Sequence, residues 1–376
     1  MIKRLIYLLI TLIVAMGICG CMEHNIGEKQ TSAVNEDAGK IKITDMLGRE
    51  VEVPKDIRTI CPLKWGSTRI IVYLNASDKI VGISEFEKNK GMNVLPYLVA
   101  HPEFKNLPII QTGVAPNVEE IVKLKPDVII ASYFTIEEAD KLQKRTGIPV
   151  VVIKPGLGAK EYINYLDNDN DFYRSLRLVA RILHKENRAE EIIKYIKNTV
   201  KDLNERTKDV PDDKKPTVYI GGLSKHGSFG ITSTQTKYPP FILVNAKNVA
   251  SGINSKSNTV RVSREKLIAW NPNIMFIDEV NLNLVIKDLK RPEYKQIAAV
   301  KNEEIYGVFP YPRYGLNHEI VLANAYYIGK VLYPDRFKNI EPEQKANEIF
   351  TFFVGKPVYK DIAKKLGGFK KLEFNN

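Results

Sequence analysis

The sequence has 376 residues, of which 44% are hydrophobic and 27% charged, as is usual for a soluble globular protein. A single hydrophobic core seldom grows beyond about 250–300 residues, so the length favours two domains. A formal net charge of +12 is compatible with binding to nucleic acid, but lysines and arginines are spread along the chain and no nucleic-acid-binding motif occurs. Nucleic acid is therefore not expected as a partner.

The N-terminus predicts export. Residues 1–21 have the layout of a secretory signal peptide: Lys3 and Arg4, then an apolar run too short for a confident spanning helix, then small residues and a cysteine. The ending ICGC resembles the lipobox of exported lipoproteins, with Cys21 as the residue that takes the lipid. An uncleaved anchor is the alternative, and both place the chain on the outer face of the cytoplasmic membrane. Residues 22–40 are polar and aperiodic, and we expect a flexible tether.

Residues 41–170 predict a first α/β lobe. A hairpin is indicated around Leu47-Gly48, and short apolar runs then alternate with helical patterns. Such alternation favours a mainly parallel sheet covered on both faces. The predicted strands cover 58–61, 79–84, 127–132 and 149–155, and the predicted helices cover 67–75, 118–126 and 136–147.

A helical connector and a second lobe follow. Residues 171–206 repeat apolar side chains at three- and four-residue steps, typical of a long amphipathic helix, but LHKENRA in the middle favours a kink or two helices. Residues 207–376 restart the alternation and end in a helical extension that we expect to pack on the second lobe. The fold class is therefore α/β, with two doubly wound lobes joined by a long helix and a ligand cleft between them.

The stretch FPYPRYGLNHE, residues 309–319, is the most informative loop. A plain turn needs only Gly, Asn or one Pro, whereas here Arg313 stands among three aromatic rings and two prolines. Ligand sites gather beyond the carboxyl ends of parallel strands, where we also find the acidic pair Asp278-Glu279. Each loop aromatic has a simpler reading as the edge of a core. The candidate ligand-binding residues are Trp65, Tyr133, Phe134, His226, Phe229, Tyr311, Arg313 and Tyr314.

Three segments, in this order, resemble the substrate-binding proteins of ABC importers for ferric siderophores, haem and cobalamin. They are TDMLGREVEVPKDIRTI and its continuation to residue 84, GVAPNVEEIVKLKPDVIIAS (113–132) and VSREKLIAWNPNIMFI (262–277). The resemblance covers roughly residues 41–340. It implies two lobes joined by one long helix, and a membrane-tethered receptor that delivers its ligand to a permease and an ATPase.

The resemblance also implies how the receptor docks. In this family a glutamate on the outer face of each lobe contacts arginines of the permease. The second-lobe position matches Glu265, and the first-lobe position falls at Glu137 or Glu138. A solvated carboxylate at a helix start is the alternative for each.

The candidate residues suit an anionic iron chelate, because aromatic walls supply contact area and Arg313 supplies a planar fork of donors. Molybdate, tungstate or cobalamin are the alternatives. No cofactor and no direct metal site is expected, since no H-x-x-x-H or cysteine cluster occurs, and DNDND (167–171) lacks the later residues of a calcium loop. We expect a monomer.

An enzyme is the rival class, because two-lobed α/β folds also include chelatases. The sequence has no G-x-x-x-x-G-K-[ST] phosphate loop and no G-x-S-x-G elbow, so we predict a protein without catalytic activity. Cys61 is the last residue of a predicted strand and is interpreted as a small core residue. His318, at the start of the last predicted helix, is interpreted as structural.

Overall fold

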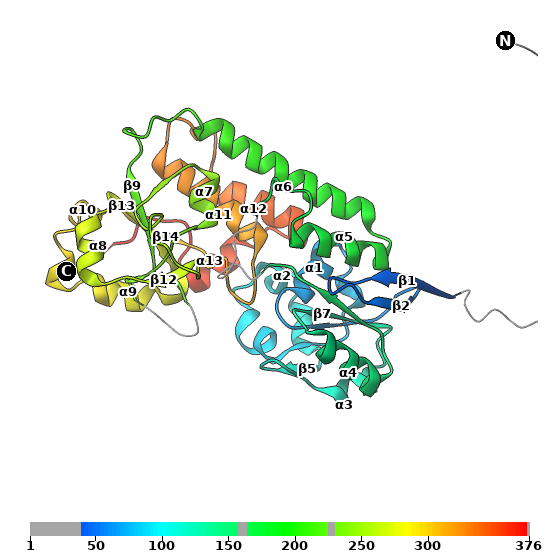
Figure 1. Cartoon of the computed structure of the whole chain (residues 1–376). Helices are drawn as coiled ribbons and strands as arrows, with labels where there is room; N and C mark the ends of the chain where they lie inside the picture. Colours follow the sequence, from blue (N-terminus) through cyan, green and yellow to red (C-terminus); the bar gives the residue numbers. More distant parts are fainter. Residues whose placement is uncertain (1–38, 157–163, 225–229, 374–376) are drawn as a thin grey trace, which may run out of the picture. The chain divides into compact units, whose positions relative to one another are not determined.

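Parallel sheets organise the computed structural model, which describes residues 39–156, 164–224 and 230–373 (Figure 1). The predicted signal peptide, Cys21 and nearly all of the tether lie outside the described residues. Residues 39–376 form one compact unit.

The first lobe contains a parallel sheet in the order β3-β7-β8, a second small sheet in the order β4-β5-β6, in which β5 and β6 are antiparallel, and an antiparallel hairpin, β1-β2. All residues of β7 and β8 are buried, which is why their sequences are continuous apolar runs. The predicted hairpin and strands are confirmed. The strands are β1 Lys40–Thr44, β2 Glu50–Pro54, β3 Ile60–Leu63, β4 Ile83–Ser84, β5 Ile109–Thr112, β6 Ala115–Pro116, β7 Val128–Ser132 and β8 Val150–Ile153.

Two helices of the first lobe, α3 and α4, begin at side-chain caps that the sequence provides. The Asn117 side chain accepts a hydrogen bond from Glu120 N, and Thr135 forms a capping box with Glu138. Gly147 ends the second of these helices in the left-handed conformation. The helices are α1 Ser67–Tyr73, α2 Pro96–Val99, α3 Val118–Leu124 and α4 Ile136–Thr146.

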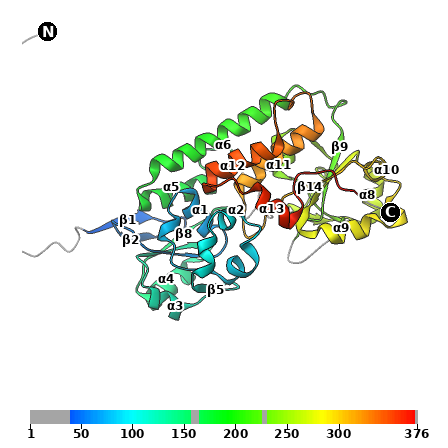
Figure 2. The ribbon, with the colours of Figure 1, turned by 180° about the vertical axis from the view of Figure 1, so that it is seen from behind.

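The connector consists of two helices, α5 (Asp171–Leu183) and α6 (Glu186–Thr207). His184 adopts φ 54° between them, and this left-handed residue ends α5 within the LHKENRA run where a break was expected. The helices pack against one another, and α6 then runs beside α11 (Figures 1 and 2).

The second lobe contains a four-stranded parallel sheet in the order β11-β9-β13-β14 and an antiparallel pair, β10-β12. Its strands are β9 Thr217–Gly221, β10 Ser233–Gln235, β11 Lys247–Asn248, β12 Thr259–Arg261, β13 Ile274–Asp278 and β14 Ile305–Val308. Its helices are α7 Pro239–Leu243, α8 Arg264–Trp270, α9 Leu282–Leu289, α10 Ala298–Lys301 and α11 His318–Leu332.

The C-terminal extension forms α12 (Pro342–Val354), α13 (Tyr359–Leu366) and a short tail. The tail pairs with β14: Leu372 N donates to Ile305 O at 2.8 Å, and Gly307 N donates to Lys370 O at 3.0 Å. We expected the extension to pack on the second lobe, but α12 also packs on α1 and α2 of the first lobe. One hydrophobic core therefore runs through the first lobe, the connector, the second lobe and the extension.

Candidate functional site

The loop of residues 309–319 connects β14 to α11 and is anchored in the second lobe. Tyr311 is fully buried, and its hydroxyl donates to Gln235 Oε1 on β10 at 2.6 Å. The Asn317 side-chain amide donates to the backbone carbonyls of Tyr311 and Arg313, both at 2.9 Å. These bonds hold the loop in one shape without regular secondary structure.

The same loop is held by the first lobe through a buried arginine. Arg69 on α1 donates from Nη1 to Leu316 O at 2.8 Å and from Nη2 to Tyr314 O at 2.9 Å. Gly315 has φ 87°, and a Cβ there would lie 3.3 Å from Arg69 Nη1 and 3.4 Å from Trp65 Cβ. Glycine is required at this position because the backbone is left-handed and the two lobes approach closely.

Arg313 and Tyr314 face the first lobe. The Tyr314 ring stacks on Phe86 with centroids 4.6 Å apart, and the Arg313 guanidinium lies 5.5 Å from the Phe86 ring. Arg313 Nε is buried and has no hydrogen-bond partner among the described residues. Burial lowers the pKa of Arg313 and the charge of Asp278 opposes this shift. A guanidinium with an unused donor is suited to an anionic ligand.

Two buried carboxyl groups, those of Asp278 and Glu279, lie at the carboxyl end of β13 in the second lobe. Burial raises the pKa of Asp278 to about 7, against the opposing effects of the Val280 N–H bond and of Arg313. Burial also raises the pKa of Glu279 to about 8, although Gly368 N donates to Glu279 Oε2 at 3.1 Å. Both groups therefore hold a proton over much of the range in which exposed carboxylates are ionised.

The remaining predicted site residues lie at strand ends of the first lobe. Trp65 and Tyr133 are partly buried, and Tyr133 has a left-handed backbone with φ 55°. Phe134 is buried, with Lys64 Nζ 4.1 Å from its ring centroid, so its ring packs within the protein. His226 and Phe229 lie outside the described residues. Of the predicted site residues, Tyr311, Arg313 and Tyr314 therefore share the loop 309–319, and Trp65 of the first lobe lies close to Gly315 of this loop.

Two residues at this site were missed from the sequence. Arg69 is a single charge in an otherwise apolar helical run, which was an available signal that it has buried partners. Phe86 lies in the helical turn after β4, but its partner Tyr314 is more than two hundred residues away and no local pattern indicates it. His318 is buried and structural, as expected: its Nδ1 lies 2.9 Å from the Tyr165 hydroxyl and its ring stacks on Phe172. Burial lowers its pKa well below the usual value.

The described residues contain no group of three His, Cys, Asp or Glu side chains placed to hold a metal ion. Within the same residues, no helix combines the length and the apolar character needed to cross a membrane.

Two α/β lobes joined by helices, with charged and aromatic side chains on a loop shared by both, define a two-lobed binding protein. Residues 60–311 match the periplasmic binding protein family, and the chain belongs to that family.

Similar proteins include the molybdate-binding protein MolA of Haemophilus influenzae, 27% identical over 326 residues that cover 83% of this chain and 90% of MolA. An uncharacterized ABC transporter substrate-binding lipoprotein of Bacillus subtilis, YvrC, is 24% identical over 87% of this chain and 96% of its own length. The Fe(3+)-citrate-binding protein YfmC of Bacillus subtilis is 27% identical over 52% of this chain and 58% of its own length.

Solved structures share the fold. The structure of MolA bound to molybdate superposes with a TM-score of 0.65 at 23% identity, covering 84% of this chain and 98% of MolA. A periplasmic solute binding protein from Veillonella parvula gives a TM-score of 0.68 at 23% identity, covering 87% and 97%.

Proposed function

We propose that this chain is the extracytoplasmic receptor of an ABC importer, which binds its ligand between two lobes and carries out no chemistry on it. The family and the named relatives support this role, and one relative is itself named a lipoprotein. The receptor would be tethered through Cys21 at the end of the signal peptide. Its contribution to transport would be its different affinity for ligand in the open and closed states.

We further propose that the ligand is a small oxyanion of the molybdate class. The observation that carries this proposal is Arg313, whose partly buried guanidinium has a free Nε donor beside Phe86. Three of the candidate rings that would form walls for a bulky chelate are already used: Tyr311 and Phe134 are buried, and Tyr314 is stacked on Phe86. The similarity to MolA over 83% of the chain supports the same class.

An iron chelate is the second candidate, because two relatives named for iron binding match about half of the chain. Differential scanning calorimetry of the chain from Glu23 onward distinguishes an oxyanion from an iron chelate as the ligand. The chain is melted with molybdate, tungstate, ferric citrate or a ferric siderophore, and sulfate serves as the control anion. A ligand at about 1,000 times its Kd adds about 4 kcal/mol to the folded state, so Tm rises by several degrees. A shift with ferric citrate or the siderophore and none with molybdate or tungstate would overturn the oxyanion proposal.

Arg313→Ala tests the residue that carries the proposal. A hydrogen bond to a charged group contributes about 1.5–3 kcal/mol, so we expect molybdate binding to weaken by about 10- to 150-fold in titration calorimetry. Arg174→Ala is the matched control, because Arg174 is an about half-exposed arginine on α5 that pairs with Asp171. Equal affinity in the Arg313 variant and the control would remove Arg313 from the site.

For docking, we propose Glu137 and Glu265. Each is the second residue of a helix whose cap is a hydroxyl side chain, Thr135 for α4 and Ser263 for α8, so the two lobes present equivalent carboxylates. Glu138, the other first-lobe candidate, closes the capping box of α4 and lies 3.3 Å from Lys64. Glu137 is exposed and has no hydrogen bond or ion pair with any described residue.

Glu137→Ala and Glu265→Ala should leave ligand affinity unchanged and reduce uptake into vesicles that contain the cognate permease and ATPase. Glu138→Ala is the control: it should lower stability, because Thr135 N–H loses its side-chain acceptor in the capping box, and leave uptake intact. Normal uptake with the Glu137 variant and reduced uptake with the Glu138 variant would reverse the assignment.

A further inference from the structure

The C-terminal segment, residues 342–372, contacts both lobes and the connector. We refer to it as the strap. In Figures 1 and 2 its helix α12 lies beside α11, with α6 alongside, and α13 continues toward the second lobe. The strap is therefore a second physical connection between the lobes, in addition to α5 and α6.

The strap reaches the first lobe through α12. The Phe353 ring packs edge-on against Tyr73 of α1 with centroids 4.9 Å apart, and both α12 and α13 pack on α2. The neighbouring Phe352 ring stacks on Tyr195 of α6 at 4.0 Å. Arg188 of α6 joins these parts, since its Nε donates to Tyr73 O at 3.1 Å and its Nη2 donates to Phe352 O.

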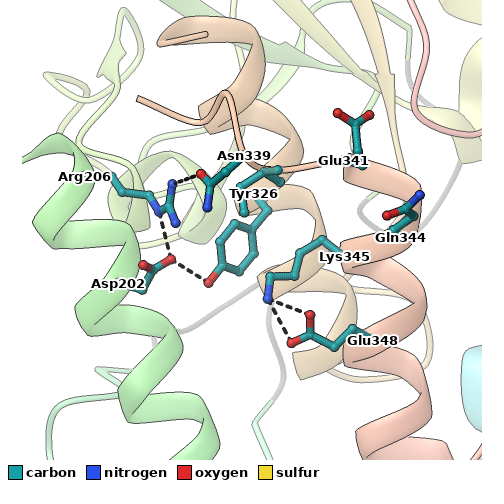
Figure 3. A pocket seen from close by; sticks show the side chains of 9 residues that line it. Asp202, Arg206, Tyr326, Asn339, Glu341, Gln344, Lys345 and Glu348 are labelled. Atoms are coloured by element: carbon teal, nitrogen blue, oxygen red, sulfur yellow. Dashed lines mark hydrogen bonds and ion pairs between the residues drawn. The ribbon is translucent and has the colours of Figure 1, made fainter. Parts of the chain in front are cut away.

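A polar cluster fixes the other end of α12 to α6 and α11 (Figure 3). The Tyr326 hydroxyl on α11 donates to Asp202 Oδ2 at 2.8 Å, and Arg206 Nε donates to the same oxygen at 2.9 Å. Lys345 of α12 lies 5.0 Å from the Tyr326 ring and donates to Glu348 at 2.8 Å. The hydrogen bonds of Asp202 join α6 to α11, and Lys345 of α12 lies over the Tyr326 ring, so three helices meet at this pocket.

The strap ends in the second lobe, next to the candidate site. Its tail pairs with β14, and Phe369 stacks on Tyr327 of α11 with centroids 4.5 Å apart and the planes 8° from parallel. Gly368 N donates to Glu279, the residue that follows Asp278 at the end of β13. Contacts at this end would persist if only the first-lobe end were released.

We propose that the strap restrains the angle between the two lobes, so that the lobes cannot separate without breaking the contact of Phe353 with Tyr73 and the Arg188 bridge between Tyr73 O and Phe352 O. The physical reason is that a rotation about the connector alone would pull α1 and α2 away from rings that are anchored, through α12, to the second lobe. This inference goes beyond the proposed function, and it does not depend on the identity of the ligand.

The test is a distance measurement between the lobes in the absence of ligand. Spin labels on Lys123→Cys, in α3, and Lys295→Cys, after α9, are read by double electron–electron resonance in the chain from Glu23 onward. Cys61 is buried and burial raises its pKa to about 12, so it stays unlabelled. The Phe352→Ala/Phe353→Leu double variant cuts the first-lobe end of the strap and leaves the tail in place.

We expect the double variant to broaden the distance distribution and to add longer distances. Thr351→Ala is the matched control, because Thr351 is exposed on the same turn of α12. If the double variant does not fold by circular dichroism, Phe352→Ala alone is measured, since Phe352 is only partly buried. A folded variant whose distribution equals that of the control overturns the proposal.

Discussion

The carboxyl group of Glu279 shows how far a buried acid depends on its neighbours. A Cβ at Gly307 or at Gly367 would lie 2.5 Å from Glu279 Oε1, so the group fits only because both neighbours lack a side chain. It accepts one hydrogen bond, from Gly368 N, and no cation pairs with it among the described residues. Ionising it in this enclosure costs free energy, and this cost is what raises its pKa.

This cost predicts a pH dependence of stability. Burial raises the pKa of Asp278 from 3.8 to about 7 and that of Glu279 from 4.5 to about 8. Between about pH 4 and 8 the folded state then binds protons that the unfolded state has released, so the free energy of unfolding falls as pH rises. Glu279→Gln should flatten the fall of Tm between pH 5 and 8.5, and Glu119→Gln, an exposed control, should not. Parallel Tm curves for Glu279→Gln and the intact chain would contradict this.

The sequence predicted the environment of a single residue correctly where the neighbouring residues in the chain determine that environment. Cys61 is a buried core residue and His318 is a buried structural one, as predicted from their neighbours in the chain. Arg69 and Phe86 were missed because their partners, Leu316 and Tyr314, are distant in sequence, and a contact between lobes leaves no periodic trace in either segment.

At the scale of elements, the loop 309–319 is where the two lobes meet. Its aromatic rings are explained by what they contact, since Tyr311 binds Gln235 in the second lobe and Tyr314 stacks on Phe86 in the first. Within the loop, Arg313 Nε and the Tyr314 hydroxyl have no hydrogen-bond partner among the described residues, and Arg313 is the charged one of the two. The loop thus connects the two lobes through its tyrosines, and through Arg313 it is also a candidate ligand-binding segment.

Arg69→Met tests the joint. The variant keeps an unbranched side chain and removes both hydrogen bonds to the loop carbonyls, which should lower the free energy of unfolding by about 2–4 kcal/mol, because buried acceptors are left unpaired. Urea unfolding of the ligand-free chain measures the change, with Arg181→Met on the exposed face of α5 as control. An unchanged midpoint would mean that the carbonyls find other partners.

The predicted strands and helices were confirmed because each has a clear period and a cap or turn residue. The surface on which each helix or strand packs could not be predicted in the same way. The apolar faces of α12 and α13 were recognised, but amphipathicity does not specify a partner, and contact with α1 and α2 was not predicted. Of the candidate site residues, Arg313 and Tyr314 both lie against Phe86, whereas Phe134 packs in the first-lobe core; that the site binds a ligand stays a prediction.

At the scale of the whole molecule, one core runs through both lobes, and two connections join them. If the strap restrains opening, the lobes separate only slightly, and the ligand must enter through that narrow opening. A small oxyanion is compatible with such a separation, whereas a bulky chelate demands more room. The spin-label distances between the lobes and the melting experiments with the candidate ligands therefore bear on the same question. Each experiment can still contradict its own proposal independently.

The pairing of the tail with β14 has a consequence for solubility. β14 would be the terminal strand of its sheet, and an exposed strand edge is a template for pairing with other chains. Residues 370–372 cover that edge with backbone hydrogen bonds. A chain shortened by proteolysis before Phe369 would expose the edge and the aromatic surface beside it, so we expect residues 369–372 to protect the protein against aggregation.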